Sequence, residues 1–297
     1  MENPAATWDC HTHCFHPDQH PFKSTRAYTP EAATIEELQR SILADNVMIV
    51  QATIEDGHRG LLDTLRAAKL QFPQMVFRGT VLADSEPGRG LLDLSQDDFA
   101  QMHELGIRSI RVHGSYGGSG ADTSWAYRQL RQAAKMFPVE HLGWSITAQL
   151  PLGTWSALSG VLAQDDELRD VVIVADHNGS ASPQDLDSPD MKAFLTLLEA
   201  GSLYVKLGAL HRRSGDVRQM EGVVKILAAK APHRILWGSD WPHVDASCKG
   251  LVPMPHLRGV SDNEELQLIQ SWLTEAQREM MLVSNPDRLF GQGPKES

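Results

Sequence analysis

Two histidines near the N-terminus, His11 and His13, have the type and spacing that chemistry requires. They lie in the segment Thr7-Trp-Asp-Cys-His-Thr-His-Cys14. Side chains at positions i and i+2 of an extended strand point to the same face. If that face is the inside of a closed barrel, the two imidazoles are aimed at one point. Imidazoles in that arrangement can hold a metal ion or polarise a carbonyl group.

Two later segments supply partners for this pair. In Ile235-Leu-Trp-Gly-Ser-Asp-Trp-Pro-His243, an apolar strand is expected to end on Asp240, and the proline then stops strand pairing. In Val171-Val-Ile-Val-Ala-Asp-His-Asn-Gly179, an apolar strand ends by presenting His177. We therefore expect His11, His13, His177 and Asp240 to form one catalytic site, or the ligand set of a single metal ion if one is bound.

The elements that must position these residues alternate along the chain. Short apolar runs predict eight buried parallel strands, over Thr7–Cys14, Val47–Thr53, Val76–Ala83, Ser109–Gly114, Trp144–Leu150, Val171–Asp176, Tyr204–Leu210 and Ile235–Asp240. Helical periodicity is expected in the segments between and after them, over Thr34–Asp45, Gly60–Gln71, Gln96–Leu105, Ser124–Phe137, Thr154–Asp165, Pro189–Ala200, Val217–Ala229, Asp262–Trp272 and Ala276–Asn285.

This alternation predicts an α/β fold, a (β/α)8 TIM barrel that forms a single domain over residues 1–297. A doubly wound sheet is the rival fold, but the chain has no Gly-x-Gly-x-x-Gly phosphate loop to support it. Barrel enzymes build their sites at the carboxyl ends of the strands. Two long loops are expected at that face, over residues 15–30 and 114–123.

Composition narrows the class of function. A chain of 297 residues that is 41% hydrophobic and 22% charged is typical of a soluble globular protein. The net charge of −11 argues against nucleic acid and anionic membranes as partners, since both require a basic surface. No apolar run of membrane-spanning length and no secretory signal is visible. These features predict a cytoplasmic enzyme acting on a small molecule, and they leave its oligomeric state open.

Cysteine usage agrees with a reducing compartment, because three cysteines form no disulfide framework. Cys10 and Cys14 are expected to pack in the core. Cys248 lies in a loop with no base beside it, which makes a catalytic thiol a poor interpretation.

Polar residues near other strand ends are candidates for substrate contacts. Arginine suits anionic groups, because its planar guanidinium can bind a carboxylate through two hydrogen bonds. Lys206 on the seventh strand is expected to be a buried ion-pair partner. The predicted substrate-binding residues are Arg111, Arg212, Tyr28, Thr53, Gln149 and His243.

Four motifs, in this order, resemble the amidohydrolase superfamily. They are Asp9-Cys-His-Thr-His, Asp176-His-Asn-Gly, Val205-Lys-Leu and Trp237-Gly-Ser-Asp-Trp-Pro-His. The closing segment Asn285-Pro-Asp-Arg-Leu-Phe290 is also similar to that of the superfamily. The chain most resembles the amidohydrolase-related branch that contains 2-pyrone-4,6-dicarboxylate lactonase and the sugar lactonases.

The resemblance implies a hydrolase and raises the question of a metal. Metal-dependent members use the strand-1 histidine pair, a lysine or glutamate near strand 4, histidines on strands 5 and 6, and the strand-8 aspartate. Here Arg111 stands where a bridging lysine is expected, and a guanidinium cannot ligate a cation. Gln149 stands in place of the strand-5 histidine. A binuclear centre is therefore not expected, whereas a single zinc or manganese ion remains chemically feasible.

The lactonase branch resembles enzymes that work without a metal, and no cofactor is our first expectation. We expect Asp240 to act as the general base for water, with His11, His13 and His177 polarising the carbonyl of a lactone. The alternative is a zinc- or manganese-dependent decarboxylase of an aromatic or unsaturated acid that uses the same four residues as ligands. A binding protein that kept the barrel and lost the chemistry is a third reading, disfavoured because all four residues are intact.

Overall fold

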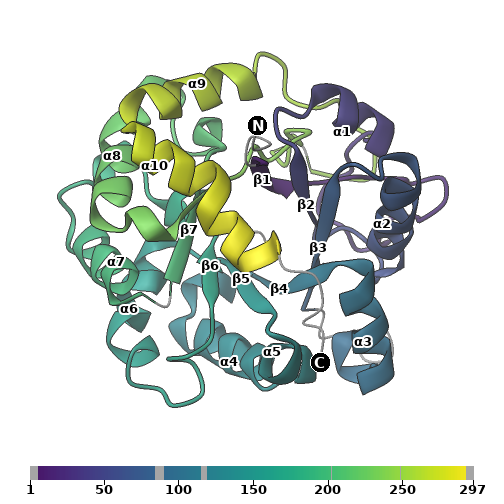
Figure 1. Ribbon diagram of the computed structural model, residues 1–297, viewed down its shortest axis with the longest axis horizontal. Helices are drawn as coiled ribbons and strands as arrows, with labels where there is room; N and C mark the ends of the chain where they lie inside the picture. The colour runs from purple at the N-terminus through teal and green to yellow at the C-terminus, as the bar shows by residue number, and fades with distance from the viewer. Residues whose placement is uncertain (1–5, 84–89, 115–118, 202, 248, 292–297) are drawn as a thin grey trace, which may run out of the picture.

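Eight parallel strands run in the order of the sequence and form the barrel of the computed structural model (Figure 1). The structure describes residues 6–83, 90–114, 119–201, 203–247 and 249–291. Each predicted strand is present, and the predicted (β/α)8 architecture is confirmed. The strands are β1 (Trp8–Thr12), β2 (Asn46–Val50), β3 (Val76–Leu82), β4 (Ile107–His113), β5 (Ser145–Gln149), β6 (Ile173–Ala175), β7 (Leu203–Leu207) and β8 (Ile235–Trp237).

Helices surround the strands and cover their outer faces (Figure 1). The helices are α1 (Ile35–Ser41), α2 (Arg59–Gln71), α3 (Gln96–Leu105), α4 (Thr123–Ala134), α5 (Phe137–Leu142), α6 (Leu152–Leu162), α7 (Pro189–Ala200), α8 (Glu221–Lys230), α9 (Asp262–Trp272) and α10 (Glu275–Glu279). Helix α5 was not predicted. Pro138 occupies its first turn, where a missing N–H costs nothing, so the proline begins a helix here instead of ending one. Within the described residues, no helix is both long and apolar enough to cross a membrane.

The barrel closes where the first and last strands meet. The N–H of Asp240 donates to the carbonyl of His11 over 2.8 Å, and the N–H of His13 donates to the carbonyl of Trp241 over 2.8 Å. Gly238 permits this approach, because a Cβ there would lie 2.7 Å from the Cβ of His11. Asp240 is thereby held beside the histidine pair although more than 220 residues separate them in the sequence.

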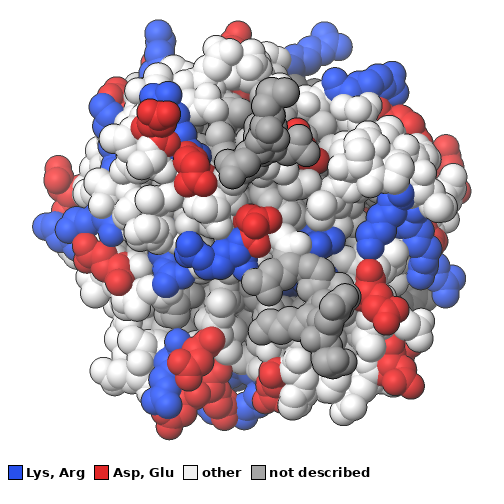
Figure 2. Space-filling model, viewed as in Figure 1, with Lys and Arg blue, Asp and Glu red and all other residues white. Residues whose placement is uncertain are grey.

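The C-terminal segment covers the end of the barrel at which the strands begin. The ring of Phe290 packs on Trp8 at the start of β1, and Asn285 Nδ2 donates to the carbonyl of Ile235 at the start of β8. This segment, yellow in Figure 1, lies in front of the strands, so the figure views the closed end. Figure 2 shows that acidic and basic side chains are interspersed over the described part of this face. The carboxyl ends of the strands are left to form the opposite face.

Several strands are shorter than predicted, and the site residues lie just beyond their ends. β1 ends at Thr12, before His13, and β8 ends at Trp237, before Asp240. Asp240 adopts a φ of 68°. A residue in that left-handed region cannot continue a strand, so β8 does not extend through Asp240 as predicted. Part of the predicted glycine-rich loop (115–118) and Cys248 lie outside the described residues.

Candidate active site

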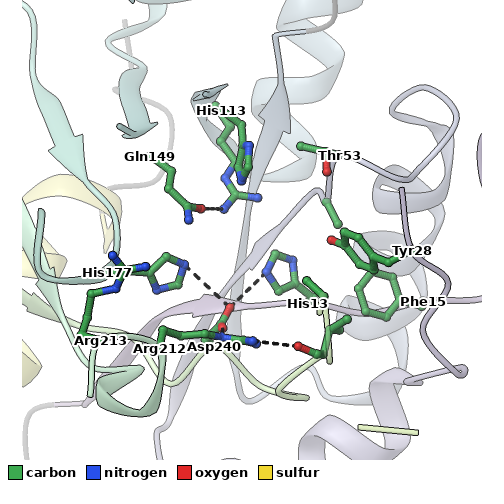
Figure 3. Close-up of a pocket in the computed structure, with 14 residues that line it drawn as sticks. His13, Phe15, Tyr28, Thr53, His113, Gln149, His177, Arg212, Arg213 and Asp240 are labelled. Atoms are coloured by element: carbon green, nitrogen blue, oxygen red, sulfur yellow. Dashed lines mark hydrogen bonds and ion pairs between the residues drawn. The ribbon is translucent and has the colours of Figure 1, made fainter. Parts of the chain in front are cut away.

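The four residues predicted to carry the chemistry converge at the carboxyl end of the barrel. Asp240 Oδ1 lies 3.4 Å from His13 Nε2 and 3.6 Å from His11 Nε2. His177 Nε2 lies 3.9 Å from the same oxygen. All four residues are buried, and Figure 3 shows His13 and His177 directed at Asp240 from opposite sides. The structure therefore brings together His11 on β1 and residues that lie just beyond the ends of β1, β6 and β8.

Asp176, to which sequence reasoning gave no role, is the centre of a buried charge network beneath the site. Its Oδ1 lies 2.9 Å from Lys206 Nζ and 3.2 Å from His11 Nδ1, and its Oδ2 lies 3.3 Å from Arg111 Nε. Burial opposes ionisation of this carboxyl group, but the charge of Lys206, followed by His11 and Arg111, holds its pKa well below the usual value. Lys206 is thus the buried ion-pair partner that the sequence predicted, 2% exposed.

The hydrogen-bond partners restrict where the imidazole protons can lie. His13 Nδ1 is 2.6 Å from the carbonyl of Val50, which can only accept, so Nδ1 donates and Nε2 of the neutral ring carries a lone pair. His11 Nε2 faces this lone pair at 3.3 Å. His11 Nδ1 is 3.2 Å from both Lys206 Nζ and Asp176 Oδ1. The tautomer of His11 therefore decides which of the contacts among His11, His13, Lys206 and Asp176 are hydrogen bonds.

The two neutral tautomers of His11 give two proton arrangements. In the first, Lys206 donates to His11 Nδ1, and His11 Nε2 donates to His13 Nε2, so every proton has an acceptor. In the second, His11 Nδ1 donates to Asp176, and the Nε2 lone pairs of His11 and His13 both face Asp240 Oδ1. The second arrangement leaves three acceptors together without a proton, and only a cation or an added proton would balance it.

Three of the four residues fit a divalent ion: one ligand atom each of His11, His13 and Asp240 all lie within 4.8 Å of one another. His177 Nε2 lies farther off, 3.9 Å from Asp240 Oδ1. The separations among the donor atoms of His11, His13 and Asp240 are 3.3, 3.4 and 3.6 Å. Ligands about 2.0–2.1 Å from a tetrahedral zinc ion are roughly 3.4 Å apart, so these separations are near those that zinc requires. In the second arrangement His11 and His13 also donate to Asp176 and to the Val50 carbonyl, as metal-bound histidines do to the groups that orient them.

A pocket of about 510 Å³, counted with the solvent at its opening, lies above these residues. Most of the predicted substrate-binding residues line it, although His11 lies beneath the floor. The lining consists of His13, Phe15, Tyr28, Ala52, Thr53, Arg111, His113, Gln149, His177, Arg212, Arg213, Asp240, Val244 and Ala246.

The pocket has one apolar and one polar wall. Phe15 stacks on His13 with ring centroids 5.9 Å apart, and Tyr28 lies on the same side (Figure 3). Gln149 lies opposite and accepts a hydrogen bond of 3.0 Å from Arg111. Sequence reasoning missed Phe15. Its parity, four residues after His11 and two after His13, was the signal that could have found it.

Charge in the pocket is predominantly positive. Arg111, Arg212 and Arg213 line it, against the single carboxylate of Asp240. Burial lowers the pKa of His177 to about 4, so that ring is neutral near pH 7. A neutral or anionic molecule therefore meets a favourable field, and a cationic molecule does not.

Arg212 donates hydrogen bonds to two groups of the segment that follows β8. Its Nε donates to Asp240 Oδ2 over 2.8 Å, and its Nη1 donates to the carbonyl of Val244 over 2.8 Å. Burial disfavours the Asp240 carboxylate, but the charge of Arg212 and then of His177 holds the pKa of Asp240 well below its usual value. Asp240 is therefore ionised across the physiological range.

His243, predicted to touch the substrate, is not among the residues that line the pocket. Its Nε2 lies 2.9 Å from Asp262 Oδ1 on α9, and its backbone N–H donates to the carbonyl of Asp240. The hydrogen bond to Asp262, acting against burial, raises the pKa of His243.

The chain is similar to known proteins over almost its whole length. The sequence profile described as "Amidohydrolase" matches residues 8–292. A 4-sulfomuconolactone hydrolase from Hydrogenophaga intermedia is 26% identical over 98% of this chain and 91% of its own length. A 2-pyrone-4,6-dicarboxylate hydrolase from Comamonas testosteroni is 23% identical over 97% of this chain and 90% of its own length.

Solved structures share the fold. A crystal structure from Acinetobacter baumannii, described as a probable 2-pyrone-4,6-dicarboxylic acid hydrolase, superposes with a TM-score of 0.71 at 19% identity. That match covers 96% of this chain and 99% of the other. The profile match spans the whole barrel, including both histidines of β1 and its exit and the aspartate after β8. The chain therefore belongs to the amidohydrolase family.

Proposed function

We propose that this protein hydrolyses a lactone, or a similarly activated ester, of a small anionic compound. The observation that carries the proposal is the Asp240 carboxylate, which faces three histidines at the floor of a pocket lined by arginines. The relatives named above are hydrolases of a muconolactone and a pyrone, and this supports ring opening over the decarboxylation that the same residues could also serve.

In the proposed reaction, Asp240 accepts a proton from a water molecule as the water oxygen attacks the ring carbonyl carbon. The carbonyl π electrons move onto oxygen and form a tetrahedral oxyanion. When that oxygen re-forms the carbonyl, the bond from carbon to the ring oxygen breaks. The ring oxygen takes the proton from Asp240, which regenerates the carboxylate. Because Asp240 is ionised and weakly basic, the step suits an activated ester better than an amide.

The oxyanion needs hydrogen-bond donors, and the structure narrows the candidates. The neutral form of His13 has no proton on Nε2, because its Nδ1 donates to Val50. His11 lies beneath the pocket, and its contact through Nε2 is to His13. Of the three predicted histidines, His177 is the best placed to donate, with the Arg111 guanidinium as a second group on the same wall. With Lys206 donating to His11, neither His11 nor His13 has a proton free for the oxyanion, and both would shape the floor beneath Asp240.

A substrate with a flat apolar face and an anionic edge fits the two walls. Phe15 and Tyr28 would contact the ring, and Thr53 and Gln149 would hydrogen-bond its oxygens. Arg111 and Arg213 would bind the anionic groups, while Arg212 mainly holds Asp240.

If a divalent ion is bound, His11, His13, His177 and Asp240 would hold it, and it would polarise the carbonyl and acidify the attacking water. We favour catalysis without a metal. The proton arrangement in which Lys206 donates to His11 needs no cation, and buried Lys206 and Arg111 repel one.

The test measures turnover of 4-sulfomuconolactone, 2-pyrone-4,6-dicarboxylate and a neutral sugar lactone, with and without a chelator. The metal content of the same protein preparation is measured by elemental analysis. We expect opening of an anionic lactone that survives chelation, and a loss of about 100- to 10,000-fold in kcat for Asp240→Asn. Near-normal turnover by that variant would refute the role of Asp240. One equivalent of zinc or manganese, with activity lost on its removal, would refute catalysis without a metal.

A further inference from the structure

A buried carboxylate outside the pocket grips the turn that carries Arg212. Glu265 lies on the inner face of α9 and is 7% exposed. Its Oε2 accepts the backbone N–H of Leu210 over 2.8 Å. Its Oε1 accepts the backbone N–H of His211 over 3.2 Å and lies 2.8 Å from His211 Nδ1. One side chain thus fixes two consecutive peptide groups immediately before Arg212.

The same turn presents the guanidinium to Asp240. Arg212 Nε is 2.8 Å from Asp240 Oδ2, while the other carboxylate oxygen of Asp240 faces the histidines. Moving the turn would move Arg212, and Asp240 would lose the group that holds its second oxygen. A displacement of about 1 Å in a catalytic group is enough to slow a reaction by roughly 100-fold.

Helix α9 also contacts the segment that carries Asp240. Asp262, three residues before Glu265 and therefore on the same helix face, contacts His243, whose N–H donates to the Asp240 carbonyl. The rings of His211 and His243 meet edge to face with centroids 5.1 Å apart. Through Glu265 and Asp262, α9 is therefore held against both loops, the one that carries Arg212 and the one that carries Asp240.

We infer that Glu265 is a positioning residue, which holds Arg212 against Asp240 and so directs the Asp240 carboxylate at the histidines. The inference rests on the proposed function. It extends the site to a helix that sequence reasoning assigned no part in the chemistry.

Glu265→Gln is the decisive substitution. A carboxylate offers two acceptor oxygens to this turn, whereas an amide offers one oxygen and places its NH2 against a donor. At least one buried N–H of the turn is then left without its acceptor. Glu264→Gln is the matched control, because Glu264 is the exposed neighbour on the same helix and undergoes the same chemical change.

We expect Glu265→Gln to lower kcat about 10- to 100-fold with KM changed less than about 3-fold, on the panel lactone that the native protein opens fastest. Glu264→Gln should retain both constants. In a crystal structure of Glu265→Gln, Arg212 Nε should no longer lie within hydrogen-bond distance of Asp240 Oδ2. In an Arg212→Ala background, Glu265→Gln should lower kcat less than about 2-fold further, because its effect passes through Arg212.

An unchanged kcat in folded Glu265→Gln, an equal loss in Glu264→Gln, or a full additional loss in the Arg212→Ala background would overturn the inference. If the native protein opens no lactone, the proposed function fails, and the crystal distance alone decides: an intact Arg212–Asp240 contact in Glu265→Gln refutes positioning. If Glu265→Gln does not fold, His211→Asn removes one of the three contacts. A smaller fall in kcat then supports the inference, and an unchanged kcat refutes it.

Discussion

Replacing Asp176 by Asn should destabilise the fold strongly. The side chain of Asp176 is fully buried between Lys206 Nζ at 2.9 Å and Arg111 Nε at 3.3 Å. Asn has nearly the same shape, so the change creates no cavity, but it leaves two buried cations without their counter-charge. Removal of one partner from a buried ion pair costs about 3–5 kcal/mol. That is a large share of the roughly 5–15 kcal/mol by which most proteins are stable.

Urea unfolding and thermal melting followed by circular dichroism would measure this cost. For a chain of this length, about 3–5 kcal/mol corresponds to a fall of roughly 5–8 °C in Tm. Asp170→Asn is the control, because that carboxylate is 88% exposed and pairs with Arg169 at the surface. It should cost less than about 0.5 kcal/mol.

The double variant Asp176→Asn/Lys206→Met tests the cause of the loss. It removes one of the two stranded cations, so it should be more stable than Asp176→Asn alone. A loss below about 1 kcal/mol in Asp176→Asn, or no recovery in the double variant, would refute the electrostatic reasoning.

Two further predictions concern pH and backbone geometry. Burial raises the pKa of Glu55 to about 8 from 4.5, so its contribution to stability is full below about pH 4.5 and is lost as the pH rises through 8. Glu55→Gln lacks this loss, and its stability relative to the native protein should rise by about 1 kcal/mol or more between pH 5 and 9; a constant difference in urea unfolding would contradict this. Gly208 has a φ of 135°, and a Cβ there would strike the Gly238 carbonyl, so Gly208→Ala should lower Tm markedly. Gly160→Ala, on α6 with nothing near its Cβ, should raise stability by about 0.5–1 kcal/mol, and equal effects of the two substitutions would contradict the steric argument.

Sequence reasoning located the reactive residues because their signals are local. The spacing of His11 and His13 follows from strand parity, and His177 and Asp240 each follow an apolar run. The structure brings these four together as predicted, while their catalytic roles stay proposals. Strand ends were less accurate, because the positive φ of Asp240 leaves no mark in the hydrophobic pattern.

The residues that support the site, Asp176 and Glu265, could not be found from local sequence patterns. Asp176 stands in a motif that drew attention only to the histidine beside it, and its role emerges from Lys206 and Arg111 on other strands. Glu265 reads as an ordinary helical glutamate, and only packing shows that it faces inward while Glu264 faces solvent.

The sequence by itself determined the barrel and the identity of the candidate site residues, because hydrophobic periodicity and residue chemistry act over a few neighbouring positions. The tertiary structure decided which groups meet, and so the proton acceptors of His11 and His13, the ionisation of Asp240 and the partner of Arg212. Those properties depend on distances such as the 3.6 Å between His11 Nε2 and Asp240 Oδ1, which lie more than 220 residues apart in the sequence, together with the burial that strengthens each charge. Such distances are set only when the eight strands close.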